Sequence, residues 1–293
     1  MQQKWVQLKM INLWVHATFQ KSFRLIRKLV LNMRTKITIL LLAVVAILQS
    51  CSQFRAFSYW GPNITDHKIF HHTNIAPSDS VFYFKEGNKD IFGKERRISV
   101  YPKGTANTLK MTYDEYLAQK TTTTAFLVIR NDSILYEQYF RGYSRDSISK
   151  IFSVSKSITS LLTGIAVDEG YIESVHDPVT KYIPELKKKD PRFERLTIEH
   201  LLNMRAGFKF NEDSYFPLSK ATRLYYGTNH LGKVKRITFK YEPGEKHEYQ
   251  SIVTALLGVV VEKATKRNLS EYLQEKVWTP LGMENRATWG YRR

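Results

Sequence analysis

The chain is organised around residues 151–162, which read IFSVSKSITSLL. Ser153 and Lys156 stand three residues apart where a helical pattern begins, and residues three apart lie on one face of a helix. Gly170 is predicted to end this helix. Its buried face is predicted to consist of Ile158, Leu161, Leu162 and Ile165. A serine needs an adjacent base to become a nucleophile at neutral pH, and a lysine amine is such a base when burial disfavours its charged form.

A Ser-x-x-Lys pattern does not identify a catalytic pair by itself, because this chain contains the pattern twice. Ser147 and Lys150 also fit it, but they precede the apolar periodicity and need not share a buried helix face. The position of Ser153 at the start of a buried helix favours the pair Ser153 and Lys156.

A second candidate element is Tyr249, which precedes another predicted helix. Residues 241–244 predict a turn, and the apolar residues from Ile252 to Val260 recur at helical spacing. Tyr249 is therefore expected in a loop that leads into a buried helix, where its phenol could pass a proton between a serine and a leaving group. A tyrosine before a helix more often packs than reacts, so this residue alone does not define a site.

Other segments give coarser predictions of structure. Two β-prone runs, residues 125–129 and 134–140, flank Asn131 and Asp132 and predict a hairpin. Residues 197–204 predict a capped helix that ends near Gly207, and residues 210–235 predict loops and short helices. Residues 52–120 are interpreted as an irregular leader segment. His71 and His72 have no further ligands at a zinc-like spacing, so no metal site is predicted.

The N-terminal region predicts export to the bacterial cell envelope. From Met33, basic residues precede an apolar run over residues 37–48, which is shorter than the roughly twenty residues that span a bilayer. Residues 48–51, Leu-Gln-Ser-Cys, resemble the lipobox of bacterial lipoproteins. Residues 33–51 are thus predicted to be a lipoprotein-type signal peptide with lipidation at Cys51, which would place the protein lipid-anchored or periplasmic. A simple cleavable signal or an uncleaved anchor is the alternative.

The charge of the chain is strongly basic. Its formal net charge is +18, and residues 1–50 contribute eight Lys or Arg and no acidic residue. Residues 1–32 are interpreted as an upstream extension, or alternatively as an amphipathic membrane-surface segment. A basic surface suits anionic partners, but no nucleic-acid-binding module is recognisable. The charge is therefore interpreted as a solvated surface, and no nucleic-acid partner is expected.

Several short motifs occur together in one order along the chain. They are the segments 152–157, 177–179, 182–186 and 196–202, then Gly207, Pro243-Gly244, Tyr249, and the segments 256–258 and 278–283. In this combination the chain resembles serine β-lactamase-related hydrolases, in particular class C β-lactamases and 6-aminohexanoate-dimer hydrolases. The resemblance covers roughly residues 60–290.

The resemblance implies a fold and a reaction. The fold would be an α/β, β-lactamase/transpeptidase-like domain in which a helical domain lies beside an antiparallel sheet. Ser153 would be the acylated nucleophile, Lys156 its base partner and Tyr249 the proton shuttle, without a cofactor. Which group deprotonates the serine is left open by the resemblance. The substrate would be a small-molecule amide, ester or peptide.

Two departures from the family pattern modify this expectation. The family's Tyr-x-Asn motif reads Tyr249-Gln250-Ser251 here, and a hydroxyl reaches less far than an amide. Ser251 is therefore the expected substrate-binding residue, in an esterase, peptidase or amide hydrolase rather than in a true β-lactamase.

The second departure concerns the end of the chain at Arg293, because family members continue with a Lys-Thr-Gly-like strand. We expect residues 121–293 to be a hydrolase domain whose C-terminal strands are missing. The alternative is a catalytically impaired, truncated homologue that acts only as a lipid-anchored envelope protein.

Overall fold

The structure is a computed structural model, and it describes residues 31–41, 44, 52–59, 61–88, 97–101, 108–213, 216, 219–227 and 229–290. The chain divides into two units, residues 1–61 with 215–227 and residues 62–214 with 228–293. Cys51 lies outside the described residues, as do residues 1–30 of the predicted upstream extension.

The first unit contains a short helix pair. Helix α2 (Ser52–Tyr59) packs against α6 (Lys220–Tyr226), and the rings of Tyr59 and Tyr226 stack with centroids 6.4 Å apart. The side chain of Ser219 caps α6 by accepting a hydrogen bond from the Thr222 amide at 3.1 Å. Residues 31–41 are also helical. Among the described residues, no helix has the length and apolar character needed to cross a membrane.

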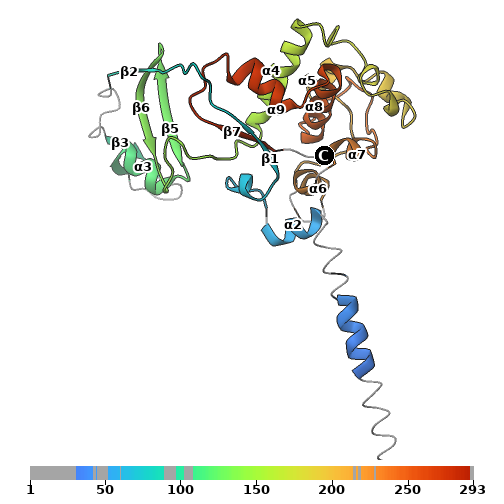
Figure 1. The fold of residues 1–293 in the computed structure, drawn as a ribbon. Coiled ribbons are helices and arrows are strands. Elements are labelled where there is room, and N and C mark those ends of the chain that lie inside the picture. Colours follow the sequence, from blue (N-terminus) through green and yellow to red (C-terminus); the bar gives the residue numbers. More distant parts are fainter. Residues whose placement is uncertain are drawn as a thin grey trace, which may run out of the picture. The chain divides into compact units, whose positions relative to one another are not determined.

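The second unit is built around α4 (Val154–Asp168) and α8 (Ser251–Thr265), which pack side by side (Figure 1). Both helices were predicted from their apolar spacing, and both predictions are confirmed. Leu162 of α4 and Leu256 of α8 are each fully buried. Burial of one such side chain stabilises the fold by roughly 1.5–3 kcal/mol.

The predicted buried face of α4 is wrong, because the observed face is shifted along the helix by one residue. The buried residues are Thr159, Leu162, Thr163 and Ala166, and Leu161 is 49% exposed. The two threonines are compatible with burial because their hydroxyls donate to the carbonyl oxygens four residues earlier, at 3.0 and 2.8 Å. Gly258 of α8 lies opposite the Thr159 methyl group, which allows the two helices to approach closely.

The second unit also contains shorter helices. They are α5 (Ile198–Leu202), α7 (His230–Val234), α9 (Leu269–Leu273), a π-turn at Gln274–Trp278, and the 3-10 helices Asp66–Lys68, Val179–Lys181, Pro184–Leu186 and Pro191–Glu194. Of these, α5, α7 and α9 contact α8. Thr197 begins α5 with a capping box in which its hydroxyl accepts from the His200 amide. This confirms the predicted capped helix, although α5 ends at Leu202, before Gly207.

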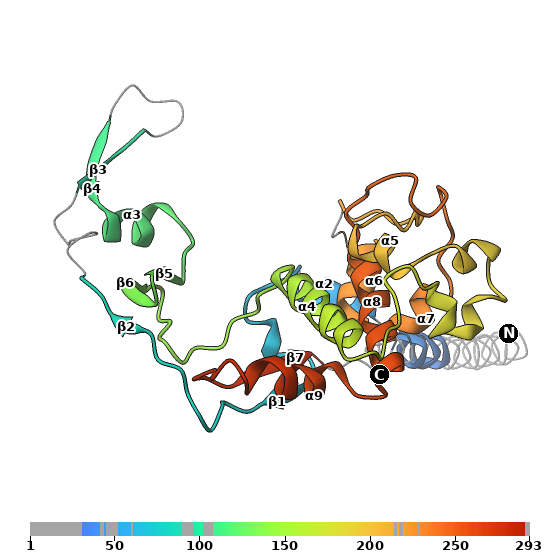
Figure 2. The same cartoon turned by 90° about the horizontal axis from the view of Figure 1, so that it is seen from above.

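The predicted hairpin is confirmed as β5 (Ala125–Arg130) and β6 (Ser133–Tyr139). Its turn residues Asn131 and Asp132 have φ of 50° and 55°, the left-handed conformations that a two-residue type I′ turn requires. Strand β2 (Lys85–Glu86) pairs parallel to β6, so the order of this sheet is β2-β6-β5 (Figures 1 and 2).

Residues 52–120 are not the irregular leader that the sequence predicted. Besides α2 and β2, this segment contains β1 (His72–Ile75), β3 (Arg97–Val100), β4 (Leu109–Thr112) and α3 (Tyr113–Lys120). Strand β3 pairs with β4, whereas β1 pairs antiparallel with β7 (Ala287–Gly290). The pairing of β1 depends on a partner more than two hundred residues away, which a local pattern cannot reveal.

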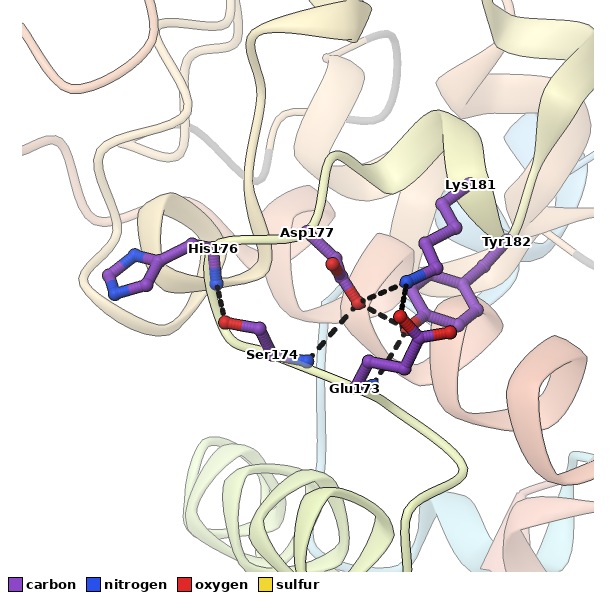
Figure 3. Close-up of polar contacts among 6 residues, drawn as sticks. All are labelled: Glu173, Ser174, His176, Asp177, Lys181 and Tyr182. Carbon is purple, nitrogen blue, oxygen red and sulfur yellow. Dashed lines mark hydrogen bonds and ion pairs between the residues drawn. The ribbon is translucent and has the colours of Figure 1, made fainter.

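A polar cluster holds the segment that follows α4 (Figure 3). Asp177 Oδ2 accepts hydrogen bonds from the Tyr182 hydroxyl at 2.7 Å, Lys181 Nζ at 3.0 Å and the Ser174 amide at 3.2 Å. Burial raises the pKa of Asp177, but these hydrogen bonds outweigh it and hold the pKa below its usual value. Burial and the bond to Asp177 also raise the pKa of Tyr182 to about 12.

We expect Asp177→Asn to lower the free energy of unfolding by about 2 kcal/mol at pH 7, because the substitution removes charge-assisted hydrogen bonds. The native pKa of Asp177 is lowered, so its contribution is present above the unfolded pKa of about 3.9 and is lost as the pH falls through the native pKa. Urea unfolding of both proteins at pH 7 and at about pH 3 measures this change. Glu173→Gln is the matched control, because the 74% exposed Glu173 side chain contacts the same Lys181 and should contribute less than about 1 kcal/mol.

Candidate active site

Ser153 lies directly before α4, after a residue with an unusual backbone. Phe152 has φ of 43°, in the left-handed region that non-glycine residues rarely adopt. Its carbonyl oxygen accepts from the amide and the hydroxyl of Ser155, at 3.1 and 2.6 Å, which ties this turn to the helix. Ser153 is solvent-exposed, so a substrate can reach its hydroxyl.

The side chain of Lys156 is the centre of the site. Its Nζ lies 3.0 Å from Ser153 Oγ and 2.9 Å from Ser251 Oγ. It also lies 4.9 Å from the ring centroid of Tyr249, within the range of a cation–π contact. The four predicted site residues of the second unit therefore meet at one amine, two from the start of α4 and two from the start of α8.

The contact of Tyr249 differs from the one that the sequence suggested. We expected its phenol oxygen to approach the serine and the lysine, whereas the lysine faces the ring. Among the described residues, the Tyr249 hydroxyl has no hydrogen-bond partner, and the side chain is 48% exposed. The phenol is thus open to a bound molecule in this arrangement.

Ser251 contacts a residue that sequence reasoning missed. Its hydroxyl donates a short hydrogen bond to Glu212 Oε1, and its amide donates to Glu212 Oε2 at 2.9 Å. Glu212 precedes Ser251 by 39 residues and belongs to a loop without periodicity. Nothing in the sequence distinguishes it from other surface carboxylates, so only the tertiary structure reveals the contact.

Gln250 connects the loop of Glu212 to the start of α8. This side chain is 3% exposed, and its Nε2 lies 3.0 Å from the Phe208 carbonyl oxygen and 2.9 Å from that of Phe210. It also lies 3.2 Å from a carboxylate oxygen of Glu248. A buried amide with such partners fixes the backbone on both sides, which positions Glu212 beside Ser251.

Gly207 begins the same loop at a position that has no space for a side chain. Its φ is 74°, and a Cβ atom there would lie 2.5 Å from the Tyr241 carbonyl oxygen. Its own carbonyl oxygen accepts from the amides of Lys240 and Tyr241, at 2.7 and 3.1 Å. Only glycine fits both the conformation and the space.

The second Ser-x-x-Lys pattern does not form a pair. Ser147 Oγ accepts from the Ser144 amide at 2.9 Å, whereas Lys150 Nζ lies 4.5 Å from the ring centroid of Phe70. Within the described part of the chain, no group of three or more His, Cys, Asp or Glu side chains could hold a metal ion.

Comparison with known proteins assigns the chain to a family. The beta-lactamase family profile matches residues 109–290, more than half of the chain. This chain belongs to the beta-lactamase family. The predicted family and the predicted α/β fold are thereby confirmed.

Two curated relatives each match about half of this chain. A 6-aminohexanoate-dimer hydrolase of Paenarthrobacter ureafaciens is 29% identical over 189 residues, covering 59% of this chain and 46% of its own length. An Escherichia coli (strain K12) protein assigned as a D-alanyl-D-alanine carboxypeptidase is 28% identical over 167 residues, covering 52% of this chain and 36% of its own length. The chain thus spans less than half the length of these relatives.

A solved structure supports the fold. A Bacillus anthracis protein assigned as a 6-aminohexanoate-dimer hydrolase superposes with a TM-score of 0.66, covering 79% of this chain and 61% of its own. Its sequence identity to this chain is 20%, so the likeness concerns the fold alone.

Proposed function

We propose that this chain carries the acylation centre of a serine hydrolase that acts on an amide or ester bond. The observation that carries the proposal is the 3.0 Å contact between Lys156 Nζ and the exposed Ser153 hydroxyl at the start of a buried helix. Family membership adds support, because the named relatives hydrolyse or are assigned to hydrolyse amide bonds. No cofactor is needed for this chemistry.

The proposed reaction has two stages. Lys156 accepts the Ser153 proton while Ser153 Oγ attacks the substrate carbonyl carbon, and the tetrahedral intermediate then expels an amine or alcohol. The leaving group takes a proton from the site, for which the exposed Tyr249 phenol beside Lys156 is the proposed shuttle. Water then attacks the carbonyl carbon of the resulting ester, the bond to Ser153 Oγ breaks, and the acyl group leaves as a carboxylic acid. One proton of that water returns through the site to Ser153 Oγ and restores its hydroxyl.

The role of Ser251 is part of the proposal. The sequence predicted that it binds substrate, but its hydroxyl already accepts from Lys156 and donates to Glu212. We therefore propose that the main role of Ser251 is to orient Lys156. A substrate could contact Ser251 only by donating a hydrogen bond to the remaining lone pair of its hydroxyl oxygen.

A fluorophosphonate probe tests the proposal. We expect the purified chain to be labelled in a time-dependent manner, with the adduct mapped by mass spectrometry to Ser153. Ser153→Ala should abolish the label, whereas the control Ser147→Ala should retain it, because Ser147 has no lysine partner among the residues that the structure describes. A folded wild-type chain without label at Ser153 would contradict the proposal and favour the alternative of a non-catalytic homologue.

A further inference from the structure

The hydrogen bonds of Ser251 have a fixed direction. A serine hydroxyl carries one hydrogen, and an ionised carboxylate can only accept. The Ser251 hydrogen is therefore used by Glu212 Oε1, and Ser251 Oγ accepts from Lys156 Nζ at 2.9 Å. Glu212 Oε2 also accepts from the Ser251 amide at 2.9 Å, so both carboxylate oxygens hold one residue in one orientation.

This direction determines where the lysine lone pair points. A neutral Lys156 amine would have two hydrogens and one lone pair. Ser251 has no hydrogen left to donate to that lone pair, so Lys156 must donate to Ser251. Ser153 Oγ, at 3.0 Å, is then the hydroxyl that can donate to the lone pair. This is the orientation that a base requires when it removes the Ser153 proton.

We infer that Glu212 is a positioning residue for Lys156 and acts through the Ser251 hydroxyl. The inference rests on the proposed function, which it deepens. In the acylation step the Ser153 O–H bond breaks, a new N–H bond forms on Lys156, and Ser153 Oγ bonds to the substrate carbonyl carbon. The hydrogen bond from Ser251 to Glu212 stays intact throughout, and Glu212 exchanges no proton.

The surroundings of Glu212 hold it in place before a substrate binds. Gln250 ties the carbonyl oxygens of Phe208 and Phe210 to the start of α8. Backbone bonds from the Lys209 amide to the Thr238 carbonyl, at 2.7 Å, and from the Lys240 amide to the Gly207 carbonyl anchor the beginning of the loop. A contact that is built before the reaction needs no reorganisation during it.

The substitution Glu212→Gln tests this inference with little change in shape. A glutamine amide can donate to Ser251 Oγ, so the Ser251 hydrogen can turn to the Lys156 lone pair and block the base. We expect the rate of fluorophosphonate labelling at Ser153 to fall about tenfold or more, which is part of the roughly 10²–10⁴-fold that a general base contributes. Asp213→Asn is the matched control, because it removes the neighbouring exposed carboxylate and should label within about twofold of the wild type.

A double-mutant cycle separates this role from a structural one. Alanine at position 251 keeps the amide that Glu212 binds but lacks the hydroxyl. If Glu212 acts through the hydroxyl, Ser251→Ala slows labelling by a similar factor, and adding Glu212→Gln slows it no further. A purely structural role predicts that Glu212→Gln slows labelling equally in both backgrounds, which would overturn the inference.

Other outcomes are equally decisive. If Glu212→Gln does not fold, Ser251→Ala alone tests the inference. Labelling of Ser251→Ala at the wild-type rate would then overturn it. If the wild type is labelled and Glu212→Gln is labelled at the same rate, the role of Glu212 is contradicted while the proposed function still holds. A wild-type chain without label at Ser153 removes the proposed function, and the inference falls with it.

Discussion

Lys156→Arg should lower the rate of Ser153 acylation by about 10³-fold, within the range expected for loss of a general base. An arginine at position 156 is a cation that can still donate hydrogen bonds towards Ser153 and Ser251. An arginine side chain does not lose its proton in proteins, so it cannot accept one from Ser153. The time course of fluorophosphonate labelling at a fixed probe concentration measures this effect.

The control for this prediction is Lys150→Arg, the equivalent change in the second Ser-x-x-Lys pattern. Lys150 packs over the Phe70 ring and lies outside the site, so its substitution should leave the labelling rate unchanged. An Lys156→Arg chain that is labelled at nearly the wild-type rate would show that the lysine supplies charge only. Another group would then have to remove the Ser153 proton.

Gly207→Ala should destabilise the fold by about 3 kcal/mol. Alanine at φ of 74° costs roughly 1–2 kcal/mol, and its Cβ atom would meet the Tyr241 carbonyl oxygen at 2.5 Å, which adds the cost of overpacking. The obstructing atom belongs to the backbone, so no side-chain rotation can relieve the contact. Urea unfolding with an unchanged m-value measures the loss.

Gly164→Ala is the matched control for Gly207→Ala. Gly164 lies inside α4, and a Cβ atom there would meet nothing within 4 Å. Alanine is the better helix former, so this change should stabilise the fold by roughly 0.5–1 kcal/mol. Equal stabilities of the two variants would contradict the steric account of Gly207. We also expect Gly207→Ala to slow Ser153 labelling, because the loop of Glu212 begins at this residue.

The sequence predictions were confirmed where a structural element depends on residues that are close together in the sequence. The β5–β6 hairpin follows from the Asn131-Asp132 turn pair between two apolar runs, and α4 and α8 follow from helical spacing. The side of α4 that is buried was mispredicted, since Thr159 and Thr163 satisfy their hydroxyls within the helix and then pack as apolar residues.

The candidate site was likewise predicted only in part. The spacing of Ser153 and Lys156 placed them on one helix face, and the resemblance to a known family added Tyr249 and Ser251. The roles of Glu212 and Gln250 were not predicted, because their partners are distant in sequence and their residue types are common on surfaces. The family profile agrees with the motifs that suggested the family.

The sequence by itself determined α4, α8, the capped start of α5, the hairpin, the family and the pairing of a serine with a lysine. Each of these depends on residues within a few turns of one another or on motifs in a fixed order. Only the tertiary structure decided which face of α4 is buried, that β1 pairs with β7, and that a carboxylate from a distant loop accepts a hydrogen bond from Ser251. The physical reason is that hydrogen bonds between distant segments depend on the path of the folded backbone, and that path leaves no periodic trace in the sequence.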